Sequence, residues 1–316
     1  MKNELSFAAT IGFFDGVHRG HQFLIESLKQ EARQHGLGSM VITFGQHPRQ
    51  VLNSDWHPLL LTTPEEKETL LRATGIDRLV VLPFDVAMSQ LSARQFMEQV
   101  LRDQLGVRLL FTGYDNHFGH QERGSDCGAQ REGFADYQHY GKELGMEVIG
   151  GTPLSEGTLR FSSSLVRRLL NEGDVTTART CLGRPYRLTG RVIHGKQIGR
   201  QLGFPTANMQ IENHDKLIPL KGVYAVLLSS PCLKEKHYGM MNIGHRPTFD
   251  GHHVTLETHI FDFQGDLYDQ TITVDFITRL RDEMPFVSPE ALKAQMQQDA
   301  QLAKQELSSY YPLQTS

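Results

Sequence analysis

The chain has 316 residues, of which 39% are hydrophobic and 22% charged, and its formal net charge at pH 7 is −4. This length suits two domains better than a single core, and the composition is that of a globular protein. The slight negative charge gives no general electrostatic reason to expect a nucleic-acid partner. Because the sequence contains neither a long apolar span nor a signal peptide, we expect a cytoplasmic protein without a membrane partner.

The three cysteines, Cys127, Cys181 and Cys232, lie far apart in the sequence and form no Cys-x-x-Cys pair. An odd number of widely spaced cysteines suggests neither a disulfide framework nor a structural zinc site. We therefore expect three buried thiols.

The first half of the chain alternates short apolar runs with amphipathic helix patterns. Five runs predict buried parallel strands, at residues 5–11, 40–44, 79–82, 107–112 and 147–149. Helical spacing of apolar residues predicts three helices, at residues 22–35, 64–73 and 93–104. The alternation is typical of a doubly wound α/β sheet, whose ligands bind beyond the carboxyl ends of the strands. Three loops should therefore converge on one cleft, at residues 12–21, 43–48 and 113–118.

The first of these loops reads Gly-Phe-Phe-Asp-Gly-Val-His-Arg-Gly-His over residues 12–21 and leads directly into a helix pattern. A helix N-terminus presents unpaired N–H groups and the positive end of the helix dipole, so phosphates bind there. Gly16 and Gly20 permit a sharp turn, while His18 and His21 project toward the same side and can donate hydrogen bonds to a phosphoryl group. The alternatives are an ordinary loop with two solvated histidines or a metal pair. The glycines and the preceding strand favour a nucleotide site.

From about residue 185 the pattern changes to short runs of β-type alternation separated by turn residues. These runs predict strands at residues 186–194, 222–228, 238–243, 253–261 and 270–276. Ser288, Pro289 and Glu290 are suited to the N-cap and first turn of a final helix. The pattern predicts a small antiparallel barrel closed by a C-terminal helix. After the helical segment 163–182 we place the domain boundary, which gives domains of residues 1–184 and 185–316.

A glycine-rich stretch lies at the start of this second half. Residues 190–196 fit part of a P-loop, but Gln197 stands where Ser or Thr would hold magnesium and no helix pattern follows, so we reject that interpretation. The basic loop at residues 195–203 can instead surround phosphates, and Thr206 and Asn208 offer oxygen ligands for a hard cation such as magnesium. Taken alone, an irregular barrel turn explains the stretch equally well.

A candidate base lies in the strand predicted at residues 253–261. Alternation places Val254, Leu256 and Ile260 on one face of this strand. Glu257 shares the other face with Thr255 and His259. A carboxylate there can accept the proton of a substrate hydroxyl that attacks a γ-phosphate. A solvated glutamate is the alternative when the strand is considered alone.

Together, these motifs resemble the bacterial bifunctional riboflavin kinase and FMN adenylyltransferase family, also called FAD synthetase, over nearly the whole chain. In the first half the matching residues are 14–21, Thr43-Phe44 with His47-Pro48, Gly113 with Asp115 and Phe118-Gly119, and Ser162-Ser163 with Arg167. In the second half they are 203–208, 221–224, 242–244, 247–249, Glu257 and Arg281. The Phe-Pro-Thr-Ala-Asn stretch is highly specific, whereas Gly-Val-His-x-Gly-His identifies only the nucleotidyltransferase superfamily.

The resemblance implies that the barrel phosphorylates riboflavin with MgATP and that the sheet domain joins FMN to the adenylyl group of a second ATP. In the kinase half it implies Glu257 as the base and Thr206 and Asn208 near Mg²⁺. Its remaining kinase-half ligand residues are Gly195, Lys196, Gly199, Gly203, Asn242 and Arg281. In the other half it implies His18 and His21 at the α-phosphate and Asp115 near the flavin. Its remaining nucleotide-binding residues there are Gly12, Asp15, Gly20, Ser163, Ser164 and Arg167.

The chain also departs from the family pattern, always in the adenylyltransferase half. The departures are Gln46 in place of Pro, Asn116 and His117 in place of an aromatic and a basic residue, Leu165 in place of Arg, and Phe13 where Asn is frequent. One alternative is therefore a riboflavin kinase whose adenylyltransferase half is degenerate. Two others are a different nucleotidyltransferase with an unrelated β domain, and a flavin-binding regulatory or storage module. Pure binding requires no base, so Glu257 argues against the storage module. The oligomeric state stays open.

Overall fold

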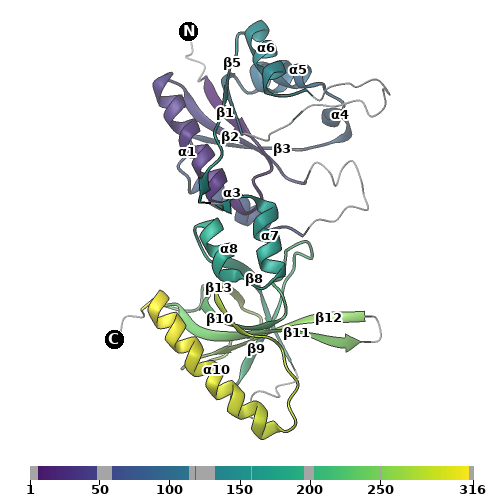
Figure 1. Cartoon of the computed structure of the whole chain (residues 1–316). Helices are drawn as coiled ribbons and strands as arrows, with labels where there is room; N and C mark the ends of the chain where they lie inside the picture. Colours follow the sequence, from purple (N-terminus) through teal and green to yellow (C-terminus); the bar gives the residue numbers. More distant parts are fainter. Residues whose placement is uncertain are drawn as a thin grey trace. The chain divides into compact units, whose positions relative to one another are not determined.

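The computed structural model describes residues 6–47, 59–113, 118, 132–157, 159–195, 203–248 and 251–312. The chain divides into two compact units, Met1–Ser163 and Ser164–Ser316 (Figure 1). The first unit is a sheet covered by helices, and the second is a barrel with a long C-terminal helix.

The first unit contains a five-stranded parallel sheet in the order β3-β2-β1-β4-β5. Its strands are β1 (Phe7–Ile11), β2 (Gly38–Phe44), β3 (Arg78–Leu82), β4 (Val107–Thr112) and β5 (Glu147–Gly150). All five predicted strands are confirmed, as is the doubly wound parallel sheet. Since β1 pairs with β2 on one side and β4 on the other, the strand order reverses at β1. Ligands bind at the carboxyl end of such a switch point.

The expectation that every strand is buried was wrong for the two edge strands. In β3 only Leu82 is buried, and in β5 only Val148, whereas β1 is buried throughout. An edge strand has a neighbour on one side only, so more of its surface reaches solvent.

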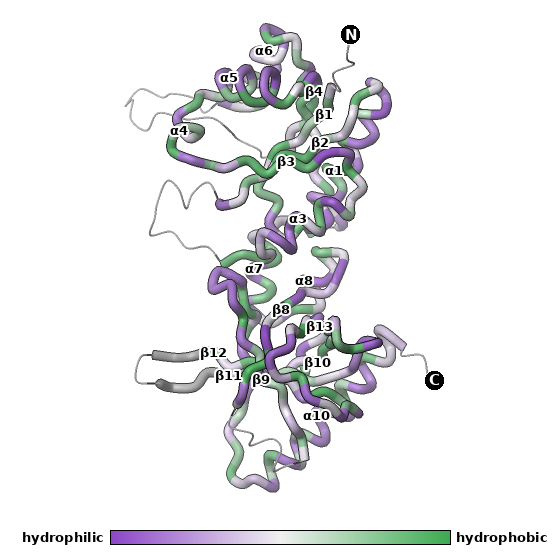
Figure 2. Tube along the Cα trace, turned by 180° about the vertical axis from the view of Figure 1, so that it is seen from behind, coloured by the Kyte–Doolittle hydropathy of each residue, from purple (hydrophilic) through white to green (hydrophobic). Residues whose placement is uncertain are grey.

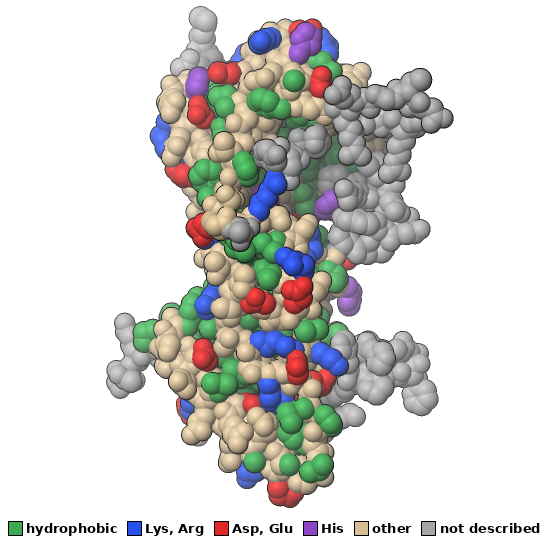
Figure 3. Space-filling view, viewed as in Figure 1, with side chains coloured by type: hydrophobic (Ala, Val, Ile, Leu, Met, Phe, Trp, Pro, Cys, Tyr) green, Lys and Arg blue, Asp and Glu red, His purple; other side chains and the backbone are tan. Residues whose placement is uncertain are grey.

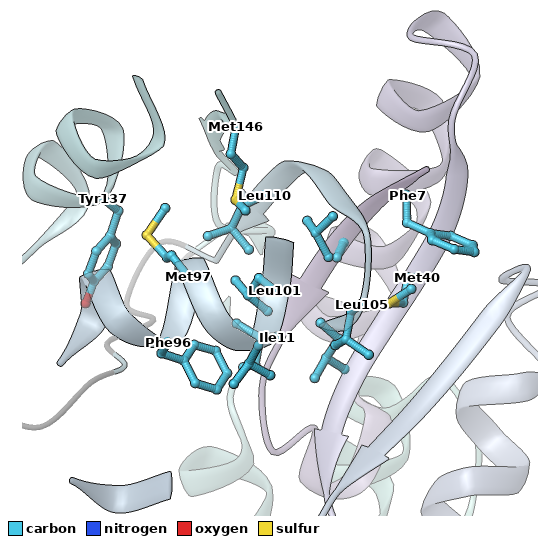
Figure 4. Packing of buried hydrophobic residues seen from close by; sticks show 14 of the residues in the cluster. Phe7, Ile11, Met40, Phe96, Met97, Leu101, Leu105, Leu110, Tyr137 and Met146 are labelled. Atoms are coloured by element: carbon cyan, nitrogen blue, oxygen red, sulfur yellow. The ribbon is translucent and has the colours of Figure 1, made fainter. Parts of the chain in front are cut away.

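Helices cover both faces of the sheet, and two separate apolar clusters form beneath them. The described helical elements are η1 (Asp15–Val17), α1 (Arg19–Gln34), α3 (Pro64–Arg72), α4 (Val86–Ser89), α5 (Ala93–Gln95), the π-helical segment η2 (Phe96–Gln104) and α6 (Phe134–Leu144). Ala8 packs with Leu28 of α1 on one face. On the other face, Ile11 lies beside Leu101 of η2, and Tyr137 of α6 belongs to the same apolar cluster (Figure 4). Figure 2 shows hydrophobic colours along the strands and mixed colours along the helices, as the amphipathic patterns predict.

The second unit contains a closed antiparallel barrel in the strand order β10-β11-β12-β9-β8-β13. The strands are β8 (Tyr186–Ile193), β9 (Thr206–Gln210), β10 (Gly222–Ser229), β11 (His237–Thr248), β12 (Gly251–Ile260) and β13 (Thr271–Arg281). Helix α10 (Pro289–Tyr310) packs Ala303 and Leu307 against Val223 and Ala225 of β10. The Ser288 hydroxyl accepts a hydrogen bond from the Ala291 N–H, which confirms the predicted N-cap. The barrel and its C-terminal helix are thus confirmed, although β9 was not predicted as a strand.

The predicted helical segment 163–182 forms two helices, α7 (Ser163–Asn171) and α8 (Val175–Leu182). They are separated at Gly173, whose φ of 81° suits glycine and ends the first helix. The hydroxyl of Thr176 in α8 lies 3.5 Å from the carbonyl oxygen of Ile277 in β13. Because α8 packs against the barrel, the contacts divide the chain into compact units after Ser163. The domain boundary after residue 184 stays a prediction.

The structure also shows where two of the three cysteines lie and how charged side chains are distributed. Cys181 is buried as expected, but Cys232 is exposed, because it lies in the turn after β10; Cys127 is outside the described residues. On the face drawn in Figure 3, Lys and Arg side chains lie next to Asp and Glu side chains in both units. None of the helices in the described ranges is long and apolar enough to cross a membrane.

Candidate active sites

The loop after β1 forms the first candidate site. Gly12 donates its N–H to the carbonyl of Ile42 (3.0 Å), and Gly16 donates to the hydroxyl of Thr62 (3.1 Å). Phe14 (φ 55°) and Val17 (φ 39°) have left-handed backbone conformations that non-glycine residues rarely adopt. Such conformations cluster at ligand-binding sites, where the surrounding structure holds them. The loop is therefore a tightly held turn at the carboxyl end of β1.

Asp15 lies within this turn and is 2% exposed. Its carboxylate accepts hydrogen bonds from the Leu61 and Thr62 N–H groups (3.0 and 3.1 Å) and from the Thr62 hydroxyl (3.1 Å). The side chain thus points into the protein and ties the loop to the segment before α3. We infer that Asp15 positions the loop, and its direct contact with a nucleotide stays a prediction.

The structure brings His18 and His21 together at the start of α1. The Nδ1 atom of His18 accepts a hydrogen bond from the His21 N–H (3.3 Å), and the two rings stack with centroids 3.6 Å apart. In the neutral ring of His18 the proton then resides on Nε2. Burial, followed by the charge of His18, lowers the pKa of His21 well below 6.5. His21 is therefore neutral at pH 7, and its buried Nδ1 has no hydrogen-bond partner in the described part of the chain.

Two more predicted residues contact the turn or the histidine pair. A Cβ atom at Gly20 would approach the His18 ring to 3.1 Å and the Phe161 carbonyl oxygen to 3.3 Å, so a side chain here would crowd the ring and require it to shift. The Ser163 hydroxyl donates to the Asp15 carbonyl (2.9 Å). Ser164 and Arg167 follow on α7 and fall in the second unit, so their contacts with ATP stay a prediction.

Two of the three predicted loops meet at the switch point. The Thr43 hydroxyl donates to the Phe13 carbonyl (3.1 Å), and the rings of Phe13 and His47 have centroids 4.5 Å apart. In the third loop, Phe118 stacks on Tyr137 (4.2 Å), but residues 114–117, which include Asp115, Asn116 and His117, lie outside the described residues. Convergence is confirmed for the first two loops.

The second candidate site is a row of polar residues across three adjacent barrel strands. Glu257 of β12 pairs in register with Asn208 of β9 on one side and Asn242 of β11 on the other. Thr206 pairs with His259 two residues along. Residues directly opposite each other in an antiparallel pair share a face of the sheet. The predicted residues Thr206, Asn208, Asn242 and Glu257 are thus brought to one surface.

A cavity of about 290 Å³ opens over this row. Its polar lining includes Thr206, Asn242, Glu257, His259 and Arg281, and its apolar lining includes Val223, Met240, Met284, Phe286, Leu292 and Met296. Helix α10 supplies part of the wall. The Arg281 guanidinium forms a bidentate pair with buried Asp299 of α10, in which Nε donates to Oδ1 (3.1 Å) and Nη2 donates to Oδ2 (2.8 Å), so the predicted ligand residue also fixes the helix.

A second cavity, of about 470 Å³, lies beside the first and shares Thr206 with it. It is lined by Val192, the residues 205–207 and the segment 263–268. At its edge the ring of Tyr268 stacks on His194 with centroids 3.9 Å apart. Two ligands placed in the two cavities would therefore approach each other at Thr206.

The glycine-rich loop contacts this row through Gly195. A Cβ atom at Gly195 would overlap the carboxamide of Asn208, so this position requires glycine for close approach. Gly203 has a φ of 86° and open space around it. Lys196 and Gly199 lie outside the described residues, and their predicted phosphate contacts stay predictions.

Gly195→Ala should lower FMN formation because the added methyl group displaces the Asn208 carboxamide from the row. We expect roughly a tenfold or greater fall in kcat/KM for riboflavin phosphorylation, the effect of a small misplacement of a reacting group. FMN-to-FAD conversion by the same sample serves as the control and should stay near the wild-type rate. Wild-type phosphorylation by the variant would contradict the role of Asn208.

His259 is a site residue that sequence reasoning placed on the right face without giving it a role. Its Nδ1 atom lies 2.8 Å from the Pro205 carbonyl oxygen, and its ring contacts Phe204 edge-on (5.0 Å). Burial lowers the pKa of His259, so the neutral ring can donate from Nδ1. This contact holds the Phe-Pro-Thr stretch against β12. The sequence signal that could have revealed this role is the position of His259, a polar residue two places after Glu257 on the same strand face.

The side chains near Thr206 can be compared with the ligands that the expected Mg²⁺ would require. Within the described ranges, no three His, Cys, Asp or Glu side chains form a cluster that could hold a metal ion. Thr206 and Asn208 supply neutral oxygens, which suit Mg²⁺ when phosphate oxygens complete its coordination. The residues present therefore fit a metal that arrives with ATP.

The fold and the two sites define a class: a two-domain transferase that handles nucleotides at a parallel-sheet switch point and in a carboxylate-lined barrel. A family model for FAD synthetase matches residues 1–165, and one for riboflavin kinase matches residues 182–307. The chain belongs to the bifunctional riboflavin kinase/FMN adenylyltransferase family.

Individual relatives agree over almost the full length. The chain is 40% identical to the bifunctional riboflavin kinase/FMN adenylyltransferase of Pseudomonas fluorescens, over 94% of this chain and 91% of that protein. It is 38% identical to the protein of that name from Escherichia coli K12, with the same coverage. A crystal structure titled as a macrolide-efflux protein from Streptococcus pneumoniae has 30% identity and a TM-score of 0.84, and covers 95% of this chain and 94% of that one.

Proposed function

We propose that this chain phosphorylates riboflavin to FMN with ATP in the barrel unit and adenylylates FMN to FAD in the sheet unit, releasing pyrophosphate. The observation that carries the proposal is the Asn208–Glu257–Asn242 row, of which Glu257 and Asn242 line the first cavity, in a chain that both family models match. We assign the adenylyltransferase domain to residues 1–184 and the kinase domain to residues 185–316.

In the kinase reaction, the apolar side of the first cavity suits a flat flavin ring. Met240, Phe286 and Met296 supply that side, and Glu257 lies on the polar side. The Glu257 carboxylate accepts the proton of the ribityl 5′-hydroxyl while that oxygen bonds to the γ-phosphorus, and ADP leaves as its bond to the γ-phosphorus breaks. The second cavity takes the nucleotide, which brings the γ-phosphate to Thr206. Mg²⁺, which we propose as the metal, supplies charge neutralisation at the phosphates when bound.

In the adenylyl transfer, a phosphate oxygen of FMN bonds to the α-phosphorus of ATP and pyrophosphate leaves. Such a displacement requires positioning and charge stabilisation more than a protein nucleophile. The start of α1 supplies backbone N–H groups, and the rings of His18 and His21 supply further hydrogen-bond donors. Asp115 near the flavin, and Ser163, Ser164 and Arg167 near the ATP phosphates, complete the proposed site.

The direct test is a time course in which purified protein is incubated with riboflavin and MgATP and the flavins are separated by chromatography. We expect FMN to appear first and FAD to follow from it. FMN without any FAD would establish a kinase alone with a degenerate adenylyltransferase half. No phosphorylated flavin at all would refute the proposal. We further propose that the protein acts in the cytoplasm.

A further inference from the structure

The structure buries Lys67 of α3 to 3% exposure, close to the loops of the first site. Its Nζ atom donates a hydrogen bond to the carbonyl of Phe44 (2.7 Å), the last residue of β2. The same ammonium lies 3.9 Å from the ring centroid of Phe13, in the turn that follows β1. Lys67 thereby connects the carboxyl end of β2 with the turn that follows β1. A lysine in an amphipathic helix is normally a solvated residue, so the sequence carries no signal for this placement.

Burial and the neighbouring charges together set the protonation state of the Lys67 amine. Burial lowers its pKa to about 8, against the opposing effects of Asp15 and then Glu68. The Asp15 carboxylate is itself occupied by the Leu61 and Thr62 N–H groups. Among the described residues, His47 is a further titratable group beside Phe13, and their ring centroids are 4.5 Å apart. The ammonium is therefore charged at neutral pH and loses its proton as the pH rises above 8.

A buried cation that contacts one carbonyl and one aromatic ring is costly to maintain. The ring face of Phe13 partly offsets that cost, because aromatic rings attract cations through their quadrupole. Perturbed titratable groups of this kind gather at functional sites. Anionic ligands of parallel sheets bind at the carboxyl ends of the strands, where a positive charge assists them.

Resting on the proposed adenylyl transfer, we propose that Lys67 is a positioning residue for that reaction. Its charged ammonium holds Phe13 and Phe44 together, and with them the turn that leads to His18 and His21, in the arrangement that accepts the triphosphate. The ammonium acts through the loop and not by contact with the substrate. Deprotonation weakens the hold on both partners, since a neutral amine is a poorer donor and has no cation–π attraction.

The first measurement is the pH profile of kcat for FMN-to-FAD conversion by the full chain between about pH 6 and 9.5. We expect an alkaline fall with a midpoint near 8, and no such fall in riboflavin phosphorylation by the same sample. Lys67→Met should lower kcat/KM for FAD formation by about ten- to a hundredfold at pH 7, the usual effect of losing a charged hydrogen bond, and should abolish the alkaline fall. Lys142→Met, which changes an exposed lysine of α6, is the matched control and should behave as wild type.

A second pair of variants tests the ring contact without removing the lysine. Phe13→Leu removes the cation–π attraction, so the pKa of Lys67 should fall further and the alkaline limb should move to lower pH. Phe13→Tyr keeps an aromatic face and should keep the limb near its wild-type position. A merely structural role for Lys67 would change the melting temperature in these variants but would not move a kinetic midpoint.

The outcomes separate cleanly. A wild-type profile that is flat to pH 9.5, or Lys67→Met with the wild-type profile, would overturn the proposal. Loss of hydrogen-exchange protection in β1 and β2 would show that Lys67→Met disturbs the fold. In that case the pH profiles of wild type and of the two Phe13 variants decide whether Lys67 positions the loop. If wild type forms no FAD at any pH, the proposed adenylyl transfer fails. The role of Lys67 is then tested by the affinity of wild type and Lys67→Met for magnesium pyrophosphate at pH 7 and pH 9. We expect wild type to bind more tightly than Lys67→Met at pH 7, and equal affinities would overturn the role of Lys67.

Discussion

Glu257→Gln should abolish FMN formation while FMN supplied from outside is still converted to FAD at a near-normal rate. The amide keeps the shape of the carboxylate but cannot accept the proton of the ribityl hydroxyl, and general-base catalysis typically contributes about a hundred- to ten-thousandfold. Both rates are measured on one sample by chromatography of the flavins. The unchanged second rate shows that the chain has folded and that the two sites are separate.

The cavity offers two other carboxylates, which makes the assignment of the base testable. Asp299 is held by the bidentate pair with Arg281, whereas Glu283 is exposed at the cavity wall. Glu283→Gln is thus the matched substitution and should keep most of the phosphorylation rate. If Glu283→Gln loses FMN formation and Glu257→Gln does not, the base is Glu283. Loss of both activities in a folded Glu257→Gln protein would contradict separate sites.

Replacing His18 and His21 together by Ala should stop FAD formation and leave riboflavin phosphorylation intact. The substitution removes two preorganised donors from the start of α1, and each such donor is typically worth about a hundred- to thousandfold in kcat. His139→Ala, which changes an exposed histidine of α6, is the control in the same unit. FAD production by the double variant at the wild-type rate would remove the proposed role.

The pH dependence of FAD formation adds a check on His21. Its pKa lies well below 6.5, so the ring stays neutral as the pH falls from 8 to 6.5. His21 should therefore cause no loss of FAD formation in that range. An acid limb centred near 6.5 that disappears in His21→Ala would show that the ring is more accessible to protons than the structure indicates.

Features set by local sequence were predicted well. The N-cap at Ser288 and the pairing of His18 with His21 depend on residues within one helical turn, so spacing alone reveals them. The polar face that carries Glu257 follows from strand alternation. These patterns also carry the family resemblance.

Features set by distant partners could not be predicted. Strand β9 forms because β8 and β12 pair with it on both sides, although Ala207 and Asn208 have little β-propensity of their own. The Asp15 carboxylate turns inward because N–H groups 46 and 47 residues away in the chain require an acceptor. The burial of Lys67 has the same origin, since its acceptor belongs to another element.

The last helix has a consequence for biosynthesis. Leu292, Met296 and Asp299 of α10 form part of the wall of the first cavity, so that wall depends on a helix that leaves the ribosome after every described strand of both units. The five strands of the parallel sheet all precede Gly151, and a nascent chain can assemble them long before translation ends. Riboflavin binding in the first cavity must therefore wait until residues 289–310 have been synthesised, and a chain truncated upstream of Pro289 would retain the parallel sheet but lack a complete pocket for the flavin ring.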